Sequence, residues 1–115
     1  MDFGLLAEHY SAFSAIAVER ASQDHKWGEQ NHSDLYWLGI LGEEYGEIAK
    51  ALIEQDTSEE AIESEVVQLA AVCVAYLECR QRERIRAARA APATVADAPA
   101  APAPLMRRAV ADESA

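Results

Sequence analysis

The chain has 115 residues, 50% of them hydrophobic, and a formal net charge of −10. This length suits one small domain, and because no apolar run reaches about 18 residues we expect no transmembrane helix and no membrane partner. Through Cys79 the sequence has three basic residues against sixteen acidic ones, which disfavours a nucleic-acid-binding surface. This acidic charge does not exclude a nucleotide substrate, since bound cations can join acidic side chains to phosphate.

Residues 3 to 21 are predicted to form the first helix. Apolar side chains recur there every three or four positions and form one stripe: Phe3, Leu6, Tyr10, Phe13 and Ala17. Nothing before Glu19 and Arg20 suggests chemistry, so we expect the stripe to pack within the chain or across a subunit boundary.

Residues 22 to 32 are polar, contain Gly28 and are predicted to form a loop. The loop supplies the first candidates for substrate contact: Lys26, Trp27, Gln30 and His32. An exposed indole stacks on a base, and an amide reads the edge of a base by hydrogen bonds. A structural explanation has equal weight, in which Trp27 plugs the end of a helical bundle and His32 helps to cap the next helix. Glu29-x-x-His32 also matches half of a di-iron bundle motif, but that architecture needs two copies on core helices.

The second helix is predicted to begin after a cap at Ser33 or Asp34 and to run to about Gln55. Its apolar stripe consists of Leu38, Leu41, Tyr45, Ile48 and Leu52. Three glycines lie inside this helix: Gly39, Gly42 and Gly46. Each glycine costs roughly 1 kcal/mol relative to alanine, so we expect another backbone to approach closely at these positions.

Carboxylates of the second helix lie beside its apolar stripe. Glu44 falls in a row with core residues, and Glu47 follows one turn later. A carboxylate taken out of water needs a compensating charge, and Lys50 is the only cation nearby in sequence. Lys50 is a candidate for phosphate contact, and an ion pair with Glu47 or Glu54 explains it equally well.

A short turn over residues 55 to 58 and a capping box of Thr57 with Glu60 predict a third helix that runs to about Ala90. The short connection makes the second and third helices antiparallel neighbours. Glu65 then lies at a depth similar to that of Glu44 and also beside the apolar stripe of its own helix. Clustered carboxylate oxygens suit a hard divalent cation such as Mg²⁺, while an ordinary solvated surface remains the alternative.

The carboxylate pattern resembles that of the MazG-like all-α nucleoside triphosphate pyrophosphohydrolases, Glu-Glu-x-x-Glu followed by Glu-x-x-Asp. The matching motifs here are Glu43-Glu44-x-x-Glu47 and Glu65-x-x-Gln68. Two flanking stretches look like the short members in phages and actinobacteria: Trp27-Gly28-Glu29-Gln30-Asn31-His32 and Trp37-Leu38-x-Ile40-Leu41. The resemblance covers about residues 15 to 78. The chain departs from the pattern at Gln68, whose amide oxygen can ligate Mg²⁺ but brings no negative charge.

The resemblance implies hydrolysis of a nucleoside triphosphate to the monophosphate and pyrophosphate, with Mg²⁺ as cofactor and Mn²⁺ as a substitute. It implies Glu43 as the base that orients or deprotonates the attacking water. The implied metal ligands are Glu44, Glu47, Glu65 and, more weakly, Gln68. The alternative is a non-catalytic helical module with a degenerate metal site, which senses nucleotides or serves for oligomerisation.

The amino-acid composition changes twice toward the C-terminal end of the chain. Five arginines crowd the last turns of the third helix: Arg80, Arg82, Arg84, Arg86 and Arg89. They complement the helix dipole, or in an oligomer they reach a neighbour's acidic cleft. From Ala91 the composition shifts to alanine with all four prolines, which predicts an all-α domain over residues 1 to 90 and a disordered tail over residues 91 to 115. Within this tail, residues 105 to 110 fit a brief helix or a docking motif.

Two features bear on the compartment and on assembly. Cys73 and Cys79 are six residues apart on one predicted helix, which indicates reduced thiols rather than a disulfide. The N-terminus lacks the pattern of a signal peptide, so we expect a cytoplasmic protein. Three helices are too few to bury their stripes, and we therefore expect a homodimer or homotetramer whose subunits complete a helical bundle.

Overall fold

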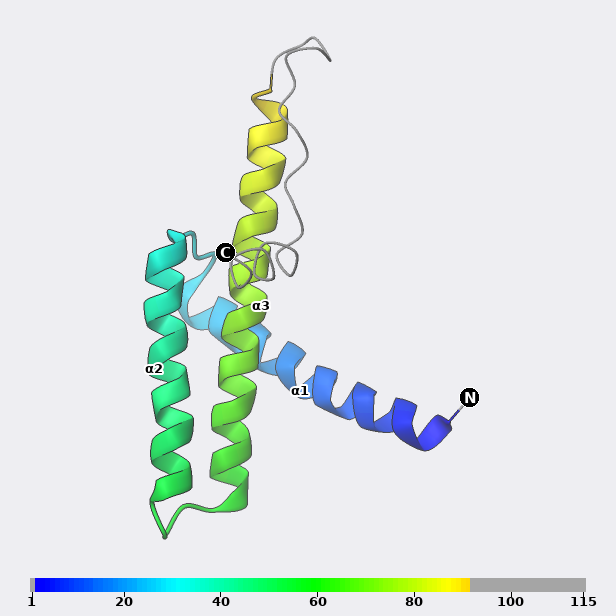
Figure 1. Cartoon of the computed structure of the whole chain (residues 1–115). Coiled ribbons are helices and arrows are strands. Elements are labelled where there is room, and N and C mark those ends of the chain that lie inside the picture. The colour runs from blue at the N-terminus through cyan, green and yellow to red at the C-terminus, as the bar shows by residue number, and fades with distance from the viewer. Residues whose placement is uncertain (1, 92–115) are drawn as a thin grey trace, which may run out of the picture. The chain divides into compact units, whose positions relative to one another are not determined.

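The computed structural model describes residues 2 to 91, which form three α-helices without a strand (Figure 1). They are α1 (Phe3–Trp27), α2 (Asp34–Ile53) and α3 (Glu59–Arg89). The predicted all-α fold is confirmed for this part of the chain. The predicted tail lies outside the described residues, apart from Ala91, and so does the candidate helix or docking motif at 105 to 110.

The first helix is longer than predicted. The expected loop over residues 22 to 32 is wrong for its first six residues, because α1 continues to Trp27. Polar side chains do not end a helix by themselves, and this stretch has no glycine or proline before Gly28. Gly28 has a φ of 68°, and its N–H donates to the Asp24 carbonyl at 2.8 Å. Only glycine adopts this φ readily, so Gly28 ends α1 and turns the chain toward α2.

The caps of α2 and α3 follow local sequence closely. Ser33 caps α2 as predicted, since its Oγ accepts from the Tyr36 N–H at 3.2 Å. For α3 the predicted cap at Thr57 is wrong by one residue, because the Ser58 Oγ accepts from the Ala61 N–H at 3.1 Å. Thr57 belongs to the preceding turn, where its N–H points to the Glu54 carbonyl at 3.5 Å.

The small core lies between α2 and α3, which run antiparallel and side by side as predicted (Figure 1). Trp37 is only 1% exposed and stacks on Tyr76, with 5.5 Å between ring centroids. Val72 and Cys79 complete the buried cluster, and partly buried residues pack around it: Ile40, Leu41, Ala75 and Tyr76. The core therefore lies next to the end of α2 that follows the 28–33 loop.

Arginine side chains of α1 and α3 hold the first unit together. The Arg20 Nε on α1 donates to Glu78 on α3 at 2.8 Å. Arg80 pairs with Asp34 at 2.7 Å, and Arg82 donates to the Gln30 carbonyl at 2.8 Å. Arg80 and Arg82 thus have specific partners at the start of α2 and in the preceding loop, which the helix-dipole interpretation did not anticipate.

The chain divides into two compact units, Met1–Glu83 and Arg84–Ala115. The core, the arginine contacts and the cavities considered below all belong to the first unit. Of the second unit, the structure describes residues 84 to 91, which include the last residues of α3.

Large apolar side chains are exposed on all three helices. In α1, Phe3 is 76% exposed and Phe13 is 66% exposed, so the predicted stripe is largely uncovered within residues 2 to 91, although the Phe13 ring meets His9 of the same helix at 6.4 Å between centroids. The glycines of α2 were expected to face a nearby backbone, but apart from adjacent residues and the backbone of the same helical turn, no atom of the described chain lies within 4 Å of a Cβ placed at any of the three. The α2 surface at these glycines is open in the single chain.

No helix among residues 2 to 91 is both long enough and apolar enough to span a membrane.

Candidate functional site

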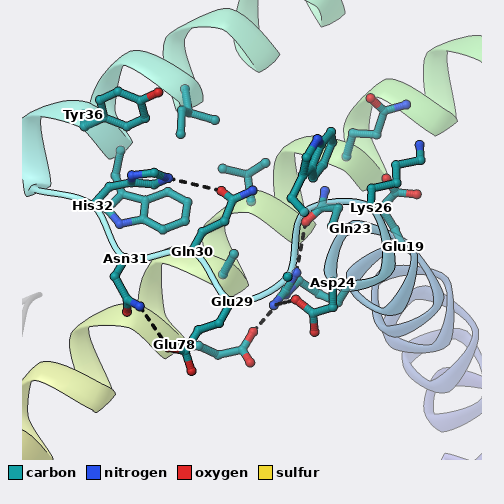
Figure 2. A pocket seen from close by; sticks show the side chains of 18 of the residues that line it. Glu19, Gln23, Asp24, Lys26, Glu29, Gln30, Asn31, His32, Tyr36 and Glu78 are labelled. Atoms are coloured by element: carbon teal, nitrogen blue, oxygen red, sulfur yellow. Dashed lines mark hydrogen bonds and ion pairs between the residues drawn. The ribbon is translucent and has the colours of Figure 1, made fainter.

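A cavity of about 1270 Å³, the main cavity, is formed by all three helices and the 28–33 loop. Figure 2 shows Gln23, Asp24 and Lys26 of α1 on one side of it and Gln30, Asn31 and His32 of the loop on the other. Its walls also include Glu44 of α2 and Gln68 of α3. The cavity thus brings carboxylate, amide and aromatic groups together from segments far apart in sequence.

Four predicted substrate contacts line this cavity: Lys26, Trp27, Gln30 and His32. Trp27 is 62% exposed, so in the single chain its indole is accessible and does not plug the end of the helix pair. The Lys26 ammonium lies 5.7 Å from the centroid of the Trp27 ring. A cation and an aromatic face are therefore placed together at this wall.

His32 is fixed by its aromatic neighbours. Its ring stacks on Tyr36 at 4.3 Å and meets Trp37 edge-on at 5.0 Å between centroids. His32 Nε2 lies 3.3 Å from the Gln30 Oε1, which ties the two predicted residues to each other. The capping role considered for His32 belongs to Ser33.

Glu44 is the acidic group whose surroundings are most unusual. Its Oε2 is buried and has no hydrogen-bond partner in the described part of the chain. Burial raises the pKa of this carboxyl above its ordinary value, and the neighbouring carboxylates Glu65, Glu47, Glu43 and Glu19 raise the pKa further. Glu44 therefore lies where a positive charge would be most stabilising.

The other predicted metal ligands divide between two cavities. Gln68 lines the main cavity with Glu44, and its Nε2 donates to the Ser64 Oγ at 3.3 Å. Glu47 and Glu65 line a second cavity of about 400 Å³ beside the α2–α3 turn. Within residues 2 to 91, no three acidic, histidine or cysteine side chains are gathered closely enough to form a ready metal-binding group.

A divalent cation such as Mg²⁺ nevertheless prefers oxygen ligands, and the Glu44 Oε2 has no other partner. The predicted ligands, three carboxylates and one amide, therefore have the ligand chemistry that such a cation needs. The catalytic candidate Glu43 is exposed and lies close enough to Glu44 to affect its pKa.

Lys50 does not line the main cavity. It lines the second cavity, and its Nζ lies 4.0 Å from the Glu54 carboxylate. The ion pair with Glu54, one of the two interpretations offered by the sequence, is therefore present. Glu29 of the rejected di-iron motif faces Arg82, at 3.5 Å.

Four residues of α1 belong to the site although sequence reasoning did not assign them to it: Glu19, Arg20, Gln23 and Asp24. Arg20 donates to Glu78 and Asp24 at 2.8 Å and to the Gln23 Oε1 at 3.2 Å. Burial alone would lower the pKa of Arg20, but the hydrogen bonds to Glu78 and Asp24 raise it. A helix predicted through Trp27 would have revealed part of this wall, because positions 19, 23 and 27 fall on one helical face.

Comparison of the chain with protein-family models, curated proteins and solved structures finds no match. The function is therefore argued from the site and from the motif resemblance.

Proposed function

We propose that this chain is a Mg²⁺-dependent nucleoside triphosphate pyrophosphohydrolase of the MazG-like type. The observation that carries the proposal is Glu44, a partly buried carboxylate with an unpartnered oxygen and four acidic neighbours, on the wall of the main cavity. A carboxylate in such a place destabilises the fold unless a cation or a proton offsets its charge. A metal-binding role accounts for that cost.

The residues that would hold the cation are Glu44, Glu47, Glu65 and Gln68. Although Glu47 and Glu65 line the second cavity, they lie close enough to Glu44 to raise its pKa. Bound Mg²⁺ would neutralise the phosphates of the substrate and make the α-phosphorus more open to attack. Glu43 is exposed beside Glu44 and accepts the proton of the attacking water. Because Glu43 is accessible, it can exchange that proton with solvent after each turnover.

The opposite part of the cavity suits the nucleoside. The exposed Trp27 indole stacks on the base, while Gln30 and His32 offer polar atoms to its edge. Lys26, placed over the Trp27 ring, contributes positive charge toward the phosphates. Lys50, held near Glu54 in the second cavity, has a weaker case for phosphate contact.

We also propose that the protein assembles as a homodimer or homotetramer in the cytoplasm. The support is the number of large apolar side chains exposed on α1, α2 and α3 of the single chain. Burial of such side chains against a second copy is the usual source of stability for a small helical subunit.

Pyrophosphate release from canonical, deoxy- and damaged-base triphosphates, with Mg²⁺ or with chelator, tests the activity. We expect Mg²⁺-dependent release that Glu44→Gln and Glu47→Gln reduce by at least about 10- to 100-fold, the loss that removal of a metal ligand's supporting group alone commonly causes. Glu63→Gln, at an exposed position on α3 that lines neither cavity, is the matched control. Activity close to wild type in both ligand variants would remove the assigned roles.

The competing function is a non-catalytic module that binds nucleotides. It is favoured by the finding that the described acidic side chains are not already gathered as a metal-binding group. Thermal stabilisation of the wild-type chain by a nucleotide, without pyrophosphate release from any triphosphate, would support this function over hydrolysis.

A further inference from the structure

The α1 wall of the main cavity contains a buried polar side chain that the proposed mechanism does not use. Gln23 is only 8% exposed, and it is the one buried polar residue in the described part of the chain. It lines the cavity between Glu19 and Trp27, each four residues away on the same helical face. A buried amide needs hydrogen-bond partners, so its surroundings indicate what it can bind.

The orientation of the Gln23 amide is set by Arg20. The Arg20 Nη1 donates to the Gln23 Oε1 at 3.2 Å, as the dashed line in Figure 2 shows. Arg20 itself is held by Glu78 and Asp24, both at 2.8 Å. An arginine fixed on both sides cannot follow a rotation of the amide, so the oxygen stays on Arg20 and the NH₂ group is left for another partner.

The Gln23 NH₂ group donates to no atom within residues 2 to 91 and, unlike the Glu44 Oε2, still reaches solvent, so it is open to a ligand. Trp27 follows one turn later on the same wall, and its ring is largely exposed. A base stacked on Trp27 would therefore bring its edge toward Gln23.

We propose that Gln23 is a specificity-determining residue that donates to a keto oxygen on the edge of the base away from the sugar. This inference rests on the proposed nucleotide function and deepens it. The site then prefers bases with a 4-keto pyrimidine or 6-keto purine group over bases with an amino group at that position. An amino group would face the Gln23 N–H donor with another donor, and the bound base would shield that N–H from water without giving it a partner.

The test uses two triphosphates that differ only at this position, dUTP and dCTP. We expect kcat/KM for pyrophosphate release by the full chain to be about tenfold or more higher for dUTP, the size of effect that one unmatched buried hydrogen bond produces. Gln23→Glu keeps an oxygen for Arg20 but removes the donors, so it should reverse the preference toward dCTP. Gln23→Leu should abolish the preference.

The matched control is Gln81→Leu, at an exposed α3 position that does not line the cavity. It should leave the dUTP to dCTP ratio unchanged. Melting curves identify a variant that fails to fold, and Gln23→Glu, which retains the Arg20 contact, decides the matter if Gln23→Leu does not fold. A merely structural role for Gln23 would change both substrates equally and leave the ratio as it is.

Binding separates failure of this inference from failure of the proposed reaction. If wild-type protein releases no pyrophosphate from any triphosphate, the hydrolase proposal fails, and titration calorimetry with dUMP and dCMP still tests Gln23. Tighter binding of dUMP, lost in Gln23→Glu, supports the inference. Equal binding of the two monophosphates, preference for the amino base, or a ratio unchanged in folded Gln23→Glu overturns it.

Discussion

At the scale of single residues, Glu44 is the position where the requirements of stability and of the proposed function conflict most clearly. Its oxygen is buried without a partner, and Glu65, Glu47, Glu43 and Glu19 add to the unfavourable potential. A residue selected for stability alone would not be placed there, since an apolar or amide side chain would cost less. Such a cost is typical of a site that binds a cation or a proton as part of its function.

The raised pKa of Glu44 predicts how the free energy of unfolding changes with pH. Because the folded-state pKa lies above its ordinary value of 4.5, the folded chain holds this proton more tightly than the unfolded chain does. The Glu44 contribution to stability is therefore unfavourable at neutral pH and improves as pH falls toward the ordinary value. Without metal at pH 7, Glu44→Gln should raise the free energy of unfolding by about 1 kcal/mol, or roughly 4–8 °C in the melting temperature.

The measurement is a set of melting curves in chelator between pH 7 and pH 4.5. The advantage of Glu44→Gln should shrink as pH falls, because the wild-type carboxyl becomes protonated. Glu63→Gln, at an exposed position, should show no such trend. A Glu44→Gln variant less stable than wild type at pH 7 would mean that the carboxylate has a favourable partner.

At the scale of elements, Arg20 joins α1 to α3. Its side chain is 14% exposed and contacts Glu78, Gln23 and Asp24. Lysine keeps the charge but lacks the planar fork that makes three directed hydrogen bonds. Arg20→Lys should therefore lower the free energy of unfolding by about 1–3 kcal/mol, which urea denaturation measures.

The exposed pair of Lys50 with Glu54 is the control for this change. Its side chains are 67% and 56% exposed and 4.0 Å apart, so Lys50→Ala should change stability by less than about 1 kcal/mol. If Arg20→Lys were equally mild, α1 would be held to α3 by apolar contacts and not by Arg20.

The helices themselves were largely predictable because their signals are local. Capping serines, glycines and three-to-four-residue apolar spacing act within one or two turns, and the short turn placed α2 beside α3. The last six residues of α1 were missed because their polar side chains look like a loop in isolation. In the fold, four of them line the main cavity: Gln23, Asp24, Lys26 and Trp27.

The candidate site was predictable only in part for the same reason. The motif spacing predicted that Glu44 and Gln68 belong to one site. In the structure both line one cavity, together with the loop residues Gln30 and His32. The role of Gln23 depends on Arg20 meeting Glu78, a contact between residues 58 positions apart. No local pattern encodes such a contact, and spacing alone could not show that Glu47 and Glu65 line a separate cavity.

At the scale of the whole molecule, the described chain buries little apolar surface. Among residues 2 to 91, five hydrophobic residues are buried: Trp37, Ala51, Ala71, Val72 and Cys79. In the same range sixteen large hydrophobic residues are exposed, and five of them lie in the first half of α1: Phe3, Leu5, Leu6, Tyr10 and Phe13. So small a core rarely stabilises a helical subunit alone, which favours the assembly proposed above.

The α1 stripe is the surface through which we expect copies of this chain to associate. Phe13 lies in the stripe and is 66% exposed in the single chain, whereas Ser11 is exposed on the opposite face of the helix. A glutamate at position 13 would have to lose its hydration in the interface. Phe13→Glu should therefore weaken self-association by about 2 kcal/mol, roughly thirtyfold, while Ser11→Glu adds the same charge with little effect. Sedimentation velocity over a range of concentrations should show a wild-type dimer or tetramer, a Phe13→Glu shift toward monomer and a Ser11→Glu profile like wild type. A wild-type chain that is monomeric at every concentration, or two variants that behave alike, would show that the stripe does not join subunits.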